Sequence, residues 1–166
     1  AATYVQEIKV PPGVNGLVPH VLLSYNHHST TAIPSGVGNG WSLNTNAIIR
    51  NTDYTPSDTS DDYFVLYMDG VTAKLVYSED DDRYHTEVES FLYIQQKQGG
   101  SNAFNQYWEV KMKDGTSYRF GYNQDSEQVS NLYEHVSRWS LDKIEDVHGN
   151  KVNYYYDEEP ENKKGL

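Results

Sequence analysis

Gly16-Leu-Val-Pro-His-Val-Leu-Leu-Ser-Tyr-Asn26 is the stretch around which we expect the rest of the chain to be organised. Val21, Leu23 and Tyr25 alternate with the side chains between them. Successive side chains of a strand point to opposite faces of its sheet. The alternation therefore predicts a half-buried strand that ends near Asn26.

A glycine cluster follows this strand and leads into a tryptophan. Gly36, Gly38 and Gly40 let the backbone take positive φ or approach another segment closely. Trp41 and Leu43 are two residues apart, which predicts that the next strand begins there. We expect Trp41 to fill the core at a sheet corner, and the glycines to be steric requirements. The unit contains no nucleophile, phosphate-binding loop or metal-ligand spacing.

Composition favours strands. The chain has 166 residues, enough for one domain with one core. It contains fifteen Tyr, three Trp and four Phe against two Met. Aromatic and β-branched side chains suit the pleated surface of a sheet. We predict an all-β fold, an antiparallel meander of hairpins that forms a sandwich-like or shell-segment structure with at most one short helix.

Charge and cysteine usage exclude several classes of function. The net charge is −11 and the isoelectric point is about 4.8, so DNA or RNA would be repelled. The absence of cysteine excludes disulfides, thiol catalysis and Cys-based zinc sites. No run approaches the roughly 20 apolar residues that span a bilayer, and Ala1–Tyr4 has no signal-peptide character. We expect no nucleic-acid partner, no membrane insertion by this segment, and any export signal to lie outside this chain.

Three pairs of apolar runs predict hairpins. They pair Tyr63–Met68 with Val71–Tyr77, Tyr107–Lys113 with Thr116–Tyr122, and Trp139–Asp146 with Lys151–Tyr156. Asp69-Gly70 and Asp114-Gly115 occupy the first two turns, and Asp-Gly favours the positive φ values that match strand twist. Trp139, at the start of the third hairpin, is expected to fill the core.

The remaining segments are predicted from their periodicity. Thr3–Val10 reads as a strand next to the organising strand, and Tyr84–Gln96 as another strand. Asp125–Trp139 has helical spacing behind a possible cap, and fits a short helix and a loop equally. We assign residues 1–156 to one β domain and residues 157–166 to a flexible tail or linker.

Two clusters have the side chains of a metal site. His27-His28 offers two imidazoles, but adjacent residues of an extended chain point in opposite directions and no third ligand follows. Glu79–Asp82 offers carboxylates, but it lacks the Asp-x-Asp-x-Asp-Gly pattern of a calcium loop. Solvated loops are the favoured interpretation of both. We predict no catalytic, cofactor-binding or metal-binding residues, and no cofactor.

The many aromatic residues leave a second function open. They are spread over every predicted strand, where they serve either as cross-strand pairs or as a stacking platform for sugar rings. Cross-strand pairs are favoured, because a platform would gather its aromatics on one exposed face. A carbohydrate-binding β-sandwich module is therefore the alternative. A hydrolase with paired carboxylates is a more distant third.

The motifs of both halves form a pattern. The first half contains Gly36-x-Gly-x-Gly-Trp41-Ser-Leu43, and the second contains Asp114-Gly-Thr116 and Trp139-x-Leu-x-x-Ile144-x-Asp146-x-x-Gly-Asn150. Together they resemble the SpvB-type N-terminal region of insecticidal toxin-complex B components, and the same region of secreted Rhs and YD-repeat proteins of the WapA-like type. The resemblance covers most of Thr3–Tyr156.

The resemblance implies a structural role without catalysis. Such a domain begins or caps a large hollow β-shell that encloses a C-terminal toxin or effector segment, in a secreted or cell-surface protein. The implied partner is the rest of the same polypeptide, with other toxin subunits as a further option. The structural motif residues are Gly36, Gly38, Gly40, Trp41, Leu43, Asp114, Gly115, Trp139, Leu141, Asp146, Gly149 and Asn150.

Overall fold

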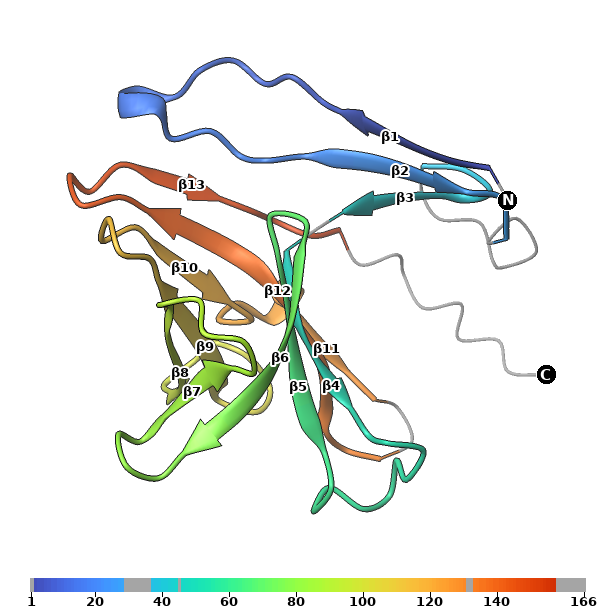
Figure 1. Ribbon diagram of the computed structural model, residues 1–166, viewed down its shortest axis with the longest axis vertical. Helices are drawn as coiled ribbons and strands as arrows, with labels where there is room; N and C mark the ends of the chain where they lie inside the picture. Colours follow the sequence, from blue (N-terminus) through green and yellow to red (C-terminus); the bar gives the residue numbers. More distant parts are fainter. Residues whose placement is uncertain (1, 29–36, 45, 131–132, 158–166) are drawn as a thin grey trace.

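Strands make up most of the regular structure. The computed structural model describes residues 2–28, 37–44, 46–130 and 133–157, and in these ranges neighbouring strands run antiparallel (Figure 1). The strands are β1 (Thr3–Glu7), β2 (Leu22–Asn26), β3 (Trp41–Asn44), β4 (Ala47–Asn51), β5 (Tyr63–Met68), β6 (Val71–Ser78), β7 (Arg83–Thr86), β8 (Tyr93–Gln98), β9 (Gln106–Lys111), β10 (Ser117–Phe120), β11 (Glu127–Val129), β12 (Val136–Glu145) and β13 (Lys151–Asn153). Short 3₁₀ turns lie at Val14–Gly16 and Gln124–Ser126. The predicted all-β, antiparallel fold class is confirmed.

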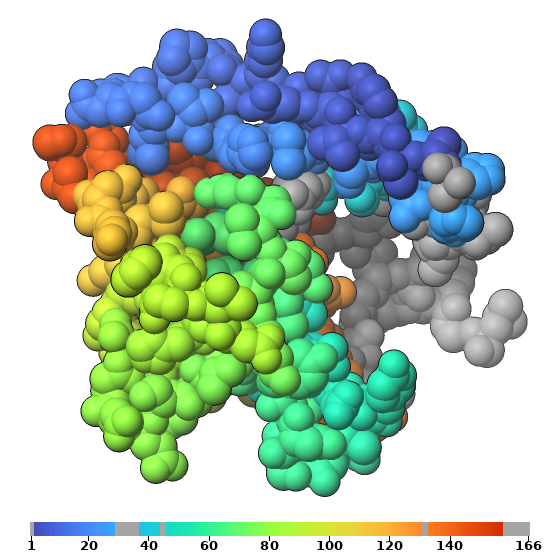
Figure 2. All heavy atoms as spheres, viewed as in Figure 1, coloured from blue at the N-terminus to red at the C-terminus, as the bar shows by residue number. Residues whose placement is uncertain are grey.

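β1, β2 and β3 form a sheet of their own, which we call the N-terminal sheet. Tyr4 pairs with Tyr25, and Tyr25 pairs with Trp41. The Trp41 ring centroid lies 6.2 Å from that of Tyr4 and 5.2 Å from that of Tyr25. The predicted pairing of the first two strands is thus confirmed. The N-terminal sheet lies across one end of the remaining strands (Figure 1 and Figure 2).

The other strands close into a barrel. They pair in the order β4-β5-β6-β7-β8-β9-β10, and β12 then joins both β10 and β4, so that eight strands of the described ranges form a ring. In the same ranges, β11 and β13 pair with β12 alone and lie outside the ring. A closed ring has no open sheet edge of its own.

β12 holds the ring together. It is ten residues long, which gives it room for two partners on each edge. Trp139 lies between β4 and β11, while Lys143 lies between β10 and β13. The N-terminal half of the strand therefore closes the barrel on β4, and its C-terminal half closes it on β10.

Aromatic side chains fill the barrel. Trp108 and Trp139 are fully buried, with ring centroids 5.9 Å apart and an interplanar angle of 74°. The Phe64 ring lies 4.9 Å from the first and 5.7 Å from the second. Edge-to-face pairs of this kind add about 0.5–1.5 kcal/mol to the gain from burial. The other buried apolar side chains are Ala47, Ile48, Leu66, Met68, Leu75, Ile94, Val110, Phe120, Val136, Leu141 and Ile144.

All three predicted hairpins are present, with different turns. Asp69 and Gly70 both have positive φ, of 50° and 82°, as a two-residue hairpin turn requires. In the second hairpin only Gly115 has positive φ, and the Met112 N–H donates to the Thr116 carbonyl at 2.9 Å. That turn is therefore longer. In the third, the Asp146 N–H donates to the carbonyl of residue 150 at 3.0 Å.

The strand predicted over Tyr84–Gln96 is wrong in its length. It is two strands, β7 and β8, separated by residues 87–92. Phe91 in this connection has a φ of 57°, a left-handed conformation that a continuous strand does not accept. Because Phe favours strands, its side chain gives no sign that the strand ends there.

The helical alternative for Asp125–Trp139 is also wrong. A 3₁₀ turn is followed by β11 and β12, and Val129 pairs with Val136 across the two strands. Val129 and Val136, two of the apolar residues that suggested one helix face, thus lie opposite each other in a hairpin. Residues 131–132 of this segment, Gly36 of the glycine cluster and residues 158–166 of the predicted tail lie outside the described residues.

The two tryptophans expected in the core differ in outcome. Trp139 is in the core, but Trp41 is half-buried on the N-terminal sheet, where it contacts Tyr4 and Tyr25. The prediction for Trp41 is wrong because its strand belongs to a sheet outside the barrel.

We expect Trp139→Ala to lower the free energy of unfolding by about 3–5 kcal/mol, because it leaves a cavity in a closed core. Trp41→Ala is the matched control and should cost about 1 kcal/mol, since only the contacts of a half-buried ring are lost. Urea unfolding followed by circular dichroism measures both. Equal losses for the two variants would contradict the assignment of Trp41 to a surface sheet.

Candidate functional site

The motif residues lie in three places. Gly38 and Gly40 have positive φ, of 116° and 76°, and precede β3; Leu43 on that strand is exposed. Trp139 and Leu141 are buried in the barrel on β12. Gly38 and Gly40 therefore shape the N-terminal sheet, while Trp139 and Leu141 are part of the barrel core.

The structure brings the two remaining motifs together. The turn that contains Asp114 and Gly115 lies beside the turn that contains Asp146, Gly149 and Asn150, because β10 pairs with β12 from its first residue. A side chain at position 115 would collide with the side chain of Val147. The glycine there is required by close approach as well as by its φ of 85°.

Asp146 explains the spacing of its motif. Its Oδ1 accepts the backbone N–H groups of His148 and Asn150, both at 2.9 Å, and its Oδ2 accepts the Asn150 side-chain amide at 2.7 Å. These hydrogen bonds, led by the one from the Asn150 side chain, lower the pKa of Asp146. Gly149 has a φ of 81°. The Asp-x-x-Gly-Asn motif is thus a turn stabilised by hydrogen bonds among its own residues.

Asp142 is a buried carboxylate that sequence reasoning missed. It is 1% exposed. Its Oδ1 accepts from Arg119 Nε at 2.7 Å, and its Oδ2 accepts the N–H groups of Tyr122 and Asn123 at 2.7 and 3.1 Å and the Ser126 hydroxyl at 3.3 Å. The carboxylate joins β12 to β10 and to the chain that follows β10. The pairing of β10 with β12 skips residue 142, because Arg119 pairs with Lys143 and Phe120 with Leu141. Asp142 is thus the extra residue at a bulge, and no strand pattern in the sequence signals its burial.

The two clusters with metal-type side chains have other contacts. His28 N–H donates to Asn26 Oδ1 at 3.0 Å, in the turn after β2. Asp81 pairs with Arg83 and His85, and the hydrogen bond from Arg83 is the main reason that the pKa of Asp81 falls to about 2. In the described part of the chain, no three His, Asp or Glu side chains are grouped as ligands of one metal ion.

The N-terminal sheet differs from the barrel in having no core. Tyr4 and Val5 point to opposite faces of β1, yet they are 54% and 60% exposed. All five residues of β1 are exposed. From the connection between β1 and β2, Leu17 contacts the barrel core. The described residues therefore leave apolar surface uncovered at β1, although small sheets rely on a packed face.

β13 offers an open edge. It pairs with β12, and the described residues supply no second neighbour for it. Tyr155, just beyond β13, is 79% exposed. Among the described residues, no helix has the length and apolar character needed to cross a membrane.

A family model matches nearly the whole chain. Residues 2–166 match the family described as Salmonella virulence plasmid 65kDa B protein. No curated protein matches the chain.

Solved structures with the same fold include toxin proteins. The N-terminal domain of effector protein SpvB from Salmonella typhimurium strain LT2 is 20% identical with a TM-score of 0.68, over 93% of this chain and 54% of that one. TcdB2-TccC3 is 18% identical with a TM-score of 0.66, over 95% of this chain and 8% of that one. The Photorhabdus luminescens Tc holotoxin pore is 19% identical with a TM-score of 0.64, over the same shares. This chain thus spans about half of the first and less than a tenth of the others.

Asp142→Asn tests the buried carboxylate. The amide cannot accept all of the N–H groups that now point at it, so we expect a loss of about 3–5 kcal/mol in the free energy of unfolding. Glu145→Gln, on the same strand, removes a carboxylate that pairs with Lys143 and Lys151 at the surface, and should cost less than about 1 kcal/mol. Thermal and urea unfolding measure both. A loss at Asp142 no greater than that at Glu145 would show that the buried pair does not hold the fold.

Proposed function

The chain belongs to the SpvB family, and on that premise we propose that it is a non-catalytic structural domain that begins or caps a β-shell in a larger secreted toxin or effector protein. The observation that carries the proposal is the contrast between its two sheets. The barrel has a complete core, whereas β1 exposes side chains on both faces. A sheet of this kind is stable when further protein covers or extends it.

The position of the N-terminal sheet suggests how the shell begins. Figure 2 shows its residues as a layer across the end of the barrel, next to β13 and the β5–β6 turn. β13 and β1 both end their sheets as edge strands among the described residues. Two such edges give later strands of a longer chain a template for backbone hydrogen bonds. The partner in this proposal is the rest of the same polypeptide, with other toxin subunits bound by the assembled shell.

The contacts of Asp142 support a structural role for this residue. Asp142, the most deeply buried carboxylate of the described residues, has its oxygens occupied by Arg119, Ser126 and backbone N–H groups. A catalytic carboxylate needs an oxygen free for the substrate. We extend the proposal to the domain limits: residues 1–156 form the domain, and residues 157–166 lead into the next part of the protein.

The distribution of aromatic rings argues against the alternative function, a carbohydrate-binding β-sandwich module. The largest aromatic group, which includes Phe64, Tyr84, Trp108 and Trp139, lies within the barrel. A sugar-stacking platform would present those rings on one exposed face. A carbohydrate-binding sandwich module is therefore less well supported than a structural domain.

Hydrogen exchange tests the proposal. In the 166-residue chain, amides of the N-terminal sheet and β13 should exchange faster than those of β5 and β9, because uncovered sheets open locally at low free energy. In the longer protein that the proposal requires, the same amides should gain protection while those of β5 and β9, the internal control, stay unchanged. Mass spectrometry of peptic fragments gives both sets. Equal protection of both sheets in the short chain, or no gain in the longer protein, would contradict the proposal.

A further inference from the structure

We propose that the outer surface of the barrel carries a binding site for an acidic saccharide, at the junction of β7 and β8. These strands are held together by one residue pair, Tyr84 with Ile94, and then part into residues 87–92. A pocket of about 280 Å³ lies at the point where they part. The residues that form its binding groups are Arg83, His85, Glu89, Phe91, Tyr93 and Lys113.

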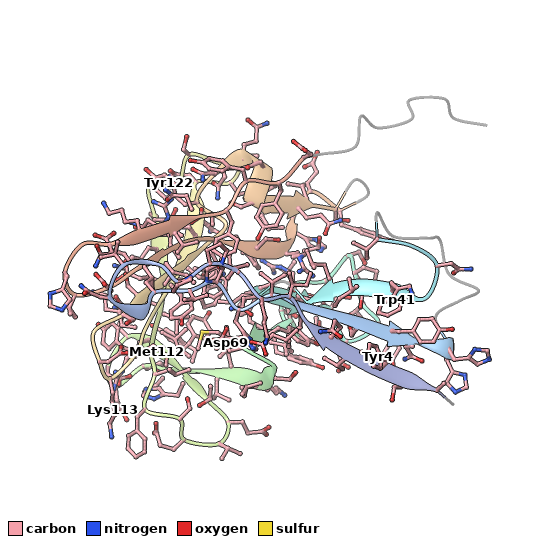
Figure 3. All side chains as sticks on the ribbon, turned by 90° about the horizontal axis from the view of Figure 1, so that it is seen from above. Tyr4, Trp41, Asp69, Met112, Lys113 and Tyr122 are labelled. Carbon is pink, nitrogen blue, oxygen red and sulfur yellow. The ribbon has the colours of Figure 1, made fainter. Side chains whose placement is uncertain are left out.

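The pocket faces outward, separate from the core. Tyr84 and Ile94 point into the barrel, where Tyr84 contacts Trp108 at 4.8 Å between ring centroids. Their neighbours Arg83 and Tyr93 must therefore point outward. Figure 3 shows Lys113 at the rim of the molecule, remote from Tyr4 and Trp41 of the N-terminal sheet. A ligand here would reach neither the core nor the surfaces assigned to the shell.

Two cations are available in the pocket. Arg83 is held through Nε by Asp81, and within the described ranges the two terminal nitrogens of its guanidinium make no hydrogen bond, so they can bind a ligand. Lys113 makes no salt bridge within the described ranges, and its Nζ lies 4.3 Å from the Phe91 ring centroid. The Arg83 guanidinium lies 5.0 Å from the centroid of Tyr93. A carboxylate between these groups would receive charge-assisted hydrogen bonds from both sides.

Phe91 supplies an exposed ring. Its side chain is 66% exposed, although its backbone is in the left-handed region with a φ of 57°. The Phe91 N–H donates to Glu89 Oε1 at 2.6 Å, which fixes this conformation. Lys113 Nζ lies over one face of this ring, and the other face is the one offered to the C–H groups of a pyranose.

Glu89 decides between classes of anion. Its carboxylate lines the pocket and accepts hydrogen bonds from hydroxyl groups, but it repels a second anion. With Asp81 nearby and a net charge of −11, a polyphosphate, a sulfated polymer or a nucleic acid is disfavoured. A neutral sugar would leave Lys113 without an anionic partner and the terminal nitrogens of Arg83 without an acceptor, because Asp81 pairs with Arg83 through Nε alone. A uronic or sialic acid has one carboxylate, several hydroxyls and an apolar C–H face, and so matches all the groups present.

The test is a titration of the ¹⁵N-labelled 166-residue chain with methyl glucuronide and with N-acetylneuraminic acid, followed by amide chemical shifts. Methyl glucoside and acetate are the neutral and anion-only controls. We expect both acids to shift amides of residues 83–93 and 112–114, the glucoside to shift none, and acetate to bind at least roughly tenfold more weakly, since it lacks the hydroxyls and the C–H face. No shifts with either acid, or equal affinity for acetate, would overturn the proposal.

Variants locate the site. Lys113→Ala and Arg83→Lys should each weaken binding roughly tenfold or more, because the first removes a cation and the second removes the guanidinium fork that binds a carboxylate with two nitrogens. The matched control is Lys74→Ala, since Lys74 lies 4.3 Å from the Tyr63 ring centroid in the same geometry, outside the pocket. Its affinity should be unchanged. Amide spectra show whether each variant is folded. An equal loss in Lys74→Ala would reveal attraction to charge in general and would refute a specific site, whatever the outcome for the shell proposal.

Discussion

The pairing of β12 with β4 and β10 is the constraint on which the rest of the structure depends. Without it, the strands from β4 to β10 would form an open sheet, and the side chains that now meet inside would face water. Closure brings Trp139 against Trp108 and seats Asp142 under the chain that leaves β10. It also fixes Gly121, whose N–H donates to the Ser140 carbonyl at 2.9 Å. Its φ is 71°, and a side chain there would collide with Trp139.

Local chemistry predicted much of this fold. The Asp-Gly turns, the period-two runs and the aromatic composition gave the hairpins and the antiparallel class, because those features depend on neighbours in sequence. Closure depends on partners such as Ile48 and Trp139, which are far apart in the chain, and no local pattern encodes that choice. Trp41 and Trp139 follow similar local signals, yet only Trp139 reaches the core, because the sheet that each joins decides burial. Asp142 escaped prediction for the same reason, since partners distant in sequence fix its burial. Phe91 escaped it for another reason, because a strand-favouring side chain gives no sign of a left-handed backbone.

The chain is divided into a closed barrel and a separate three-stranded sheet, and the two parts have different roles in the proposed function. The barrel satisfies its own edges and core, so it serves as a rigid base. The N-terminal sheet has neither a buried face at β1 nor a neighbour beyond it in the described residues, and Leu17, in the connection between β1 and β2, packs against the barrel core. The solved SpvB domain shares the fold at 20% identity, a level at which backbone ladders and turn geometry are common features and most side chains are not. The functional surfaces of this chain therefore have to be argued from its own residues.

The most direct test of the central claim is a set of interstrand nuclear Overhauser effects on both edges of β12. The account predicts backbone contacts between Trp139 and Ile48 and, in the same sample, between Tyr118 and Ile144. Amides on both edges of β12 should also exchange more slowly than those of β1, because a closed ladder opens only with the barrel. Contacts on one edge without the other would show an open sheet and would contradict the account.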